Sequence, residues 1–145
     1  MRVVLGVEYA GGAFCGFQSQ PSRCGVQDAL EDAIGEIAGH PVGVVAAGRT
    51  DARVHAASQI VHFDTDAERP LTAWVRGVNA HLPADVAVLW AHPAPPEFHA
   101  RFTATARHYS YLLLNRAERP ACSRAARAGT ISRSTWQPCS KPSQC

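Results

Sequence analysis

The sequence predicts an α+β fold in which a mixed or antiparallel sheet has its helices packed on one face. Two observations support this fold class. Short segments rich in β-branched and aromatic residues alternate with two longer segments whose apolar residues recur at helical spacing. The connecting segments are long enough to cross over between strands. The expected order is strand, helix, strand, strand, helix, strand, strand.

The first strand should cover Arg2–Ala10, where β-branched residues are frequent and alternate loosely with others. Residues 11–25 should form a loop, because they contain several glycines, Pro21 and many polar side chains. Within this loop, Phe14 and Phe17 either pack inside the protein or stack on a nucleic-acid base.

A helix should follow at residues 26–39, where apolar residues recur every three or four positions and Gly39 can end the helix. Two strands should come next, at residues 41–48 and 57–65. Alternate residues of the second strand would face opposite sides of the sheet, with Ile60 and His62 on one side and Val61 and Phe63 on the other.

Residues 70–82 should form the second helix, with Pro70 in its first turn. A fourth strand is expected at residues 85–93. Residues 98–115 should begin as a loop and end as a fifth strand, whose alternate residues include Tyr109, Tyr111 and Leu113.

Charge divides the chain into two parts. Residues 1–115 carry 8 Lys/Arg and 11 Asp/Glu, a net charge of −3, whereas residues 116–145 carry 6 and 1, a net charge of +5. We expect one globular domain at 1–115 and a basic tail at 116–145 that stays disordered, because the tail has too few large apolar residues to offset its ordering entropy. The overall charge of +2 is too small to establish a nucleic-acid partner.

The sequence predicts a cytoplasmic protein without membrane attachment. No apolar run approaches the roughly 18 residues needed to span a bilayer, and the N-terminal segment lacks the cleavage pattern of a signal peptide. The cysteines are odd in number and include no C-x-x-C pair, so free thiols are expected rather than a disulfide framework or a zinc site. They are Cys15, Cys24, Cys122, Cys139 and Cys145.

The segment "AAGRTDARVHAASQIVHF" places a carboxylate, Asp51, in a turn between two expected strands. Arg49 lies two residues before it, and a nearby cation favours the ionised carboxylate. An ionised Asp at such a turn could serve as a nucleophile or an electrostatic stabiliser. The alternative is structural: Thr50 and Asp51 could hydrogen-bond nearby backbone N–H groups in an Asx-turn.

The other candidate residues carry weaker signals. His55 and His62 lack a third ligand at metal spacing, so no metal site is predicted. His99 and Arg101 could bind phosphate or belong to a solvated loop. Tyr109 and Tyr111 either pack on the sheet or stack on a base.

A resemblance to a known family favours the nucleophile interpretation of Asp51. "AGRTDARVHA" closely resembles "GRTDAGVHA", the signature of the bacterial tRNA pseudouridine synthase A family. Further segments that resemble the family, in the same order, are "LGVEYAGGAFCGFQSQ", "VQDALEDAI", "VHF", "GVNAHLPADVAV" and "FHARFTATARHYSYLLLN". The resemblance covers residues 2–121, and it implies the first half of the pseudouridine synthase fold.

The resemblance implies a function and a set of site residues. The family isomerises uridine to pseudouridine in the anticodon stem-loop of tRNA, at tRNA positions 38 to 40, without a cofactor or metal, and acts as a homodimer. Asp51 would be the nucleophile, Arg49 its neighbouring cation, and Tyr109 the aromatic residue against the target uracil. Further candidate RNA contacts are Arg53, His55, Gln18 and Arg101.

The chain also departs from the family pattern. Arg53 stands where the family has glycine, which would cost roughly 1–2 kcal/mol if this position requires a positive φ. His108 and Ser110 stand where the family is usually more basic. Family members continue through a second, similar half, whereas residues 122–145 resemble nothing in the family and read like a frameshift. We therefore expect the 145-residue chain to lack activity, and the alternatives are a non-catalytic RNA-binding fragment or a pseudogene product.

Overall fold

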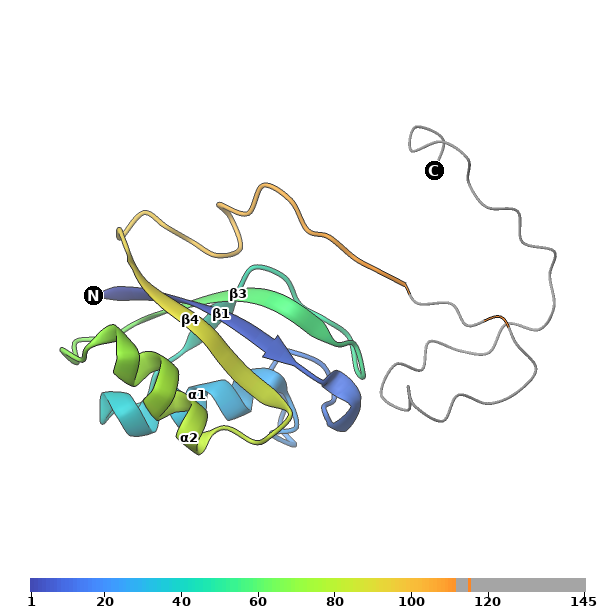
Figure 1. Ribbon diagram of the computed structural model, residues 1–145, viewed down its shortest axis with the longest axis horizontal. Helices are drawn as coiled ribbons and strands as arrows, with labels where there is room; N and C mark the ends of the chain where they lie inside the picture. The colour runs from blue at the N-terminus through green and yellow to red at the C-terminus, as the bar shows by residue number, and fades with distance from the viewer. Residues whose placement is uncertain (112–114, 116–145) are drawn as a thin grey trace. The chain divides into compact units, whose positions relative to one another are not determined.

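The computed structural model describes residues 1–111 and residue 115. The chain divides into two units, Met1–His108 and Tyr109–Cys145. The first unit contains a four-stranded antiparallel sheet in the order β2-β3-β1-β4, and Figure 1 shows both helices on one face of it. The strands are β1 (Arg2–Tyr9), β2 (Val44–Ala46), β3 (Ala56–Asp64) and β4 (Val86–Ala94). The α+β prediction is confirmed.

The central strand β1 supplies the middle of the core. Its alternate residues Val3, Leu5 and Val7 are fully buried, as the period of two in a strand requires. Val61 and Phe63 of β3 are buried on the same helix-covered side. The predicted division of β3 into two faces is therefore confirmed.

The helices cover this apolar face. Helix α1 (Val26–Ala38) begins after Gly25, whose N–H donates to Asp28 Oδ2 at 2.9 Å, and ends at Gly39, whose φ is 79°. The second helical segment consists of a π-helix, η2 (Ala73–Gly77), followed by α2 (Val78–His81).

The largest core side chains join the helices and the N-terminal loop to the sheet. Trp74 packs edge-on against Phe63, with ring centroids 5.2 Å apart, and Leu30 and Ile34 of α1 are fully buried. Phe17 is also buried, so the structure selects the packing alternative for this loop residue. Each such side chain stabilises the fold by about 1.5–3 kcal/mol through burial.

Two strand predictions need correction. β2 is only three residues long, against eight expected, and Tyr109 and Tyr111 are not in a strand. An alternating pattern shows which side chains could share a face, but a strand also needs a backbone partner for its ladder of hydrogen bonds. Leu113 and the basic tail predicted at 116–145 lie outside the described residues.

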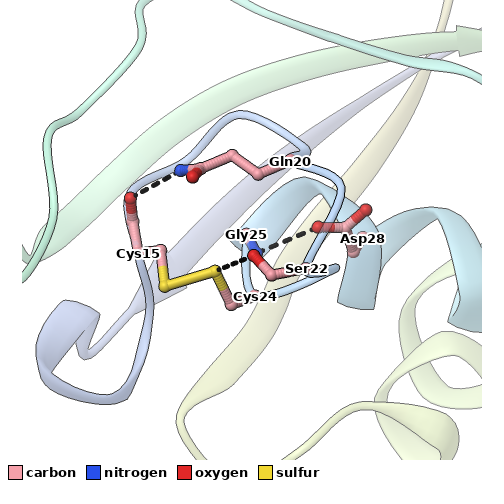
Figure 2. The surroundings of a disulfide bond; sticks show 6 residues. All are labelled: Cys15, Gln20, Ser22, Cys24, Gly25 and Asp28. Atoms are coloured by element: carbon pink, nitrogen blue, oxygen red, sulfur yellow. Dashed lines mark hydrogen bonds between the residues drawn. A yellow bond between two sulfur atoms is a disulfide. The ribbon is translucent and has the colours of Figure 1, made fainter.

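The expectation of free thiols is wrong for two cysteines. Cys15 and Cys24 form a disulfide with their Cα atoms 5.4 Å apart (Figure 2). They are nine residues apart and match no short cysteine motif, so sequence spacing did not reveal the pair. The loop doubles back, and the Cys15 N–H donates to the Cys24 carbonyl at 2.9 Å.

No helix in the described part of the chain is long and apolar enough to cross a membrane.

A loop after β4 crosses the face of the sheet that the helices leave uncovered (Figure 1). The Ala100 N–H donates to Nδ1 of His62 at 3.1 Å, and the His99 ring lies 4.9 Å from the His62 ring. His62 is buried beneath this loop. Burial lowers the pKa of His62 below its ordinary value of 6.5, and the positive charges of Arg2 and His99 lower it further, whereas Asp64 opposes them.

This pKa shift predicts acid sensitivity. The unfolded chain takes up a proton at His62 below about pH 6.5, while the folded chain resists it until a lower pH. The stabilisation is therefore present above pH 6.5 and is lost as the pH falls through the folded pKa. We expect His62→Asn, which keeps an acceptor near the Nδ1 position, to reduce the loss of stability between pH 7 and 5.

Urea unfolding at several pH values measures this effect. His92→Asn changes an exposed histidine on β4, which is separated from β3 by β1, and should keep the original pH dependence. Identical pH profiles for the His62 variant and the unsubstituted chain would contradict the role given to His62.

Candidate active site

Four of the predicted site residues lie on the turn between β2 and β3. Asp51 is exposed, and its carbonyl accepts the Val54 N–H at 3.2 Å, which closes the turn. Arg49, Arg53 and His55 are also exposed on this segment. The structure thus brings four of the seven predicted residues onto one short turn.

Two buried polar side chains hold the turn from the sheet side. The Tyr9 hydroxyl lies 2.7 Å from Thr50 Oγ1, and Gln59 Nε2 donates to the Gly48 carbonyl at 2.7 Å. Tyr9 and Gln59 are 4% and 8% exposed, so water competes little for these bonds. Sequence reasoning missed both residues. The available signal was a glutamine on a β-branched strand, in the alternating series that continues to Val61 and Phe63.

The N-terminal loop holds the turn from a second side. The Phe17 N–H donates to the Thr50 carbonyl at 2.9 Å, and the Arg53 N–H donates to the Phe14 carbonyl at 3.4 Å. Gly16, with φ of 116°, lets the two backbones approach closely, because a β-carbon there would lie 3.0 Å from the Thr50 carbonyl oxygen. The residues on both sides of Asp51 are therefore fixed to one loop.

Arg107 supports the strand that enters the turn. Its Nε and Nη2 donate to the Ala47 carbonyl at 2.9 and 2.5 Å, and Nη2 also donates to the Arg101 carbonyl at 3.3 Å. Sequence reasoning did not select Arg107, because the contact joins segments 60 residues apart. These bonds bring the segment that carries Arg101 next to the turn.

The Asp51 carboxylate is available for chemistry. It accepts no hydrogen bond and joins no ion pair among the described residues, so the Asx-turn alternative is not observed there. The expected pairing with Arg49 is also absent in this part of the chain, where both residues are exposed to solvent. A carboxylate free of other partners can accept a proton, bind a cation or attack an electrophile.

Arg53 adopts a backbone conformation that favours glycine. Its φ is 67°, which confirms that this position requires a positive φ. The conformation destabilises an L-residue by roughly 1–2 kcal/mol, and glycine would remove this strain. Glycine would also destabilise the folded state by about 0.4–1 kcal/mol, because it raises the conformational entropy of the unfolded chain. We therefore expect Arg53→Gly to raise the free energy of unfolding by about 0.5–1 kcal/mol.

Arg53→Ala is the matched control, because it removes the side chain but keeps the positive φ and should give no such gain. Urea denaturation compares the three chains. If both variants instead bind tRNA more weakly and with a flatter salt dependence, Arg53 contacts phosphate. Equal free energies of unfolding for the Gly and Ala variants would contradict the claim that the positive φ at residue 53 strains a residue other than glycine.

The other three predicted residues, Gln18, Arg101 and Tyr109, lie outside the turn, and His55 also borders a pocket. Gln18 is exposed on the N-terminal loop. His55 lines an open pocket of ≈ 380 Å³ together with Glu8 and Asp85. The Arg101 guanidinium lies 5.9 Å from the centre of the Phe102 ring. Tyr109 is 62% exposed and belongs to the second unit, so its place beside Asp51 stays a prediction.

The described residues contain no group of three or more His, Cys, Asp or Glu side chains placed to hold a metal ion.

A family model and individual relatives all match this chain under the same family name. Residues 6–103 match the family described as tRNA pseudouridine synthase. Over 120 residues the chain is 65% identical to a Thiobacillus denitrificans protein named tRNA pseudouridine synthase A, a match that covers 83% of this chain and 46% of the relative. Proteins of the same name from Dechloromonas aromatica and Vibrio vulnificus are 64% and 54% identical over the same coverage. The chain spans about half the length of these curated relatives.

Proposed function

The chain belongs to the tRNA pseudouridine synthase family, and from this premise we propose that it supplies the nucleophilic half of an enzyme that isomerises uridine to pseudouridine in the anticodon stem-loop of tRNA. Asp51 is the proposed nucleophile. The observation that supports this role is an exposed carboxylate at the tip of a turn whose backbone is held by the sheet, by the N-terminal loop and by Arg107. A fixed backbone places a reacting group without further ordering when the substrate binds.

The chemistry needs only the carboxylate and the substrate's own atoms. A flipped uridine exposes its glycosidic bond, which a base inside a helical stack does not. The carboxylate adds covalently to the base or sugar, and the bond from ribose C1′ to uracil N1 breaks. The uracil turns and rejoins C1′ through C5, and the bond to Asp51 breaks with its electron pair returning to the carboxylate. The C5 proton is lost and N1 gains a proton, so no atom is added or removed overall.

RNA contacts should come from the same side of the unit. Arg49, Arg53 and His55 are exposed beside Asp51, and the Arg101 backbone is tied to the turn through Arg107. Since residues 1–115 carry a net charge of −3, attraction to phosphate depends on this local group of arginines and not on overall charge. Gln18 and Tyr109 complete the proposed set, with the tyrosine ring stacking on the uracil.

We further propose that the complete enzyme acts in the cytoplasm as a homodimer. Its first half would correspond to residues 1–115.

A hybrid protein tests the function. Residues 1–115 of this chain replace the matching part of the Thiobacillus denitrificans relative, and the product is incubated with unmodified tRNA. We expect pseudouridine in the anticodon stem-loop, detected by mass spectrometry of nuclease fragments. The 145-residue chain is assayed in parallel. A folded hybrid that binds tRNA without forming pseudouridine would support the non-catalytic RNA-binding alternative.

A further inference from the structure

The loop that holds the Asp51 turn is closed by the disulfide between Cys15 and Cys24. We propose that these two cysteines are a reversible thiol–disulfide exchange site. Its reaction partners are low-molecular-weight disulfides of the glutathione type and small dithiols. Its oxidation state controls how firmly the N-terminal loop holds the turn. The exchange site stands independently, whereas its effect on catalysis rests on the proposed function.

The two sulfur atoms differ in access and in surroundings. The residue Cys15 is exposed and Cys24 is half-buried, a difference that favours attack by an external thiolate on the Cys15 side. The Ser22 hydroxyl lies 3.0 Å from Cys24 Sγ (Figure 2). Because a disulfide sulfur carries no hydrogen, the hydroxyl is the donor in this contact. A donor aimed at Cys24 favours this sulfur as the one that leaves as a thiolate.

The exchange balances without any further reactant. The external thiolate bonds to Cys15 Sγ, the Cys15–Cys24 bond breaks, and its electron pair remains on Cys24 as a thiolate. The second thiol of the dithiol then displaces Cys15 and releases the dithiol as its own disulfide. In the other direction, the two cysteines reduce one small-molecule disulfide to two thiols. Disulfides in a reducing compartment are usually transient and regulatory, which suits an accessible bond of this kind.

The disulfide is linked to the Asp51 turn through the backbone. Phe14 and Phe17 lie on either side of Cys15, and they contact Arg53 and Thr50. Cys24 lies two residues before the start of α1, where the Val26 N–H donates to the Gly16 carbonyl at 3.1 Å. The disulfide therefore fastens the segment that holds Asp51 to the start of the helix.

Reduction should loosen this connection without unfolding the protein. The Cys15 N–H to Cys24 carbonyl bond at 2.9 Å and the bond from Gln20 Nε2 to the Cys15 carbonyl at 3.0 Å do not depend on the covalent link. The loop would then open more often, and the hydrogen bonds on both sides of Asp51 would open with it.

Peptide mapping of the full 145-residue chain tests the exchange site. Trypsin cleaves after Arg23, so fragments 3–23 and 24–49 stay joined only through the disulfide. The folded chain is equilibrated in glutathione buffers of different ratios, alkylated and digested. We expect the joined pair to appear and disappear reversibly with the buffer ratio. Full alkylation of both cysteines at every ratio, or a joined pair that never responds, would overturn the proposal.

Ser22→Ala tests the direction of exchange. Loss of the hydroxyl should slow reduction by dithiothreitol by roughly 2–10-fold, the range that one hydrogen bond provides. Ser58→Ala, an exposed serine on β3, should leave the rate unchanged. Cys122→Ser, Cys139→Ser and Cys145→Ser, combined in one chain, exclude exchange with the remaining cysteines. Unchanged reduction of the Ser22 variant would overturn the assignment of Cys24 as the leaving sulfur.

Amide hydrogen exchange tests the link to the turn and does not require activity. The amides of Phe17 and Arg53 should exchange roughly 3–10-fold faster in the reduced chain, and likewise in a Cys15→Ser, Cys24→Ser double variant. The Gly39 amide donates a hydrogen bond to the Gly35 carbonyl at the far end of α1, and its exchange rate should be the same in both redox states. Equal exchange in both redox states would overturn the link even if the hybrid forms pseudouridine. An inactive hybrid with redox-dependent exchange would instead contradict only the proposed function.

Discussion

Asp51→Asn should abolish pseudouridine formation by the hybrid enzyme, with a rate reduction of roughly 10³-fold or more, the loss expected when a covalent nucleophile is removed. The two side chains have nearly the same shape, and the turn is held by backbone contacts that the substitution does not touch. Affinity for tRNA should therefore stay within a few-fold. Pseudouridine formation and tRNA binding are measured on the same preparation.

Asp66→Asn is the matched control, because it removes an exposed carboxylate just beyond β3 and should leave the rate unchanged. Measurable turnover by the Asp51 variant, at more than a trace of the original rate, would disprove the role as nucleophile. A loss of tRNA binding equal to the loss of activity would make Asp51 a binding residue.

Gly11→Ala should destabilise the fold by about 2–3 kcal/mol, at the upper part of the range for overpacked sites. Gly11 is buried where β1 gives way to the N-terminal loop. A β-carbon there would overlap the carbonyl of Val54, whose N–H closes the Asp51 turn. The overlapping group is backbone, which cannot rotate away as a flexible side chain could. The loop and the turn would have to separate, so catalysis by the hybrid should fall as well.

Gly12→Ala provides a control one residue away. A β-carbon at Gly12 has no heavy atom within 4 Å, so the free energy of unfolding of this variant should differ from that of the unsubstituted chain by no more than about 0.5 kcal/mol. Urea denaturation of both variants measures the difference. Equal midpoints for the Gly11 and Gly12 variants would show that the loop and the turn can separate at little cost.

Much of the fold could be predicted from local pattern. The apolar spacing from Val26 to Ile37 predicted α1 and its end at Gly39, and alternation within β3 predicted how its residues divide between the two faces of the sheet. Asp51 was selected by its place in a turn and by the resemblance around it. The family glycine marked Arg53 as a position to examine for a positive φ, and the structure supplied the value of 67°. All of these signals depend on residues that are close together in the sequence.

The supports of the site could not be predicted in this way. Tyr9 and Thr50 are 41 residues apart, and Arg107 and Ala47 are 60 apart. The pairing of Cys15 with Cys24 depends on the path of a loop that no periodic pattern describes. Burial periodicity is a property of one segment and is visible in its residues. A hydrogen bond or disulfide requires two particular atoms to come within a few ångströms, and only the tertiary fold decides which atoms those are.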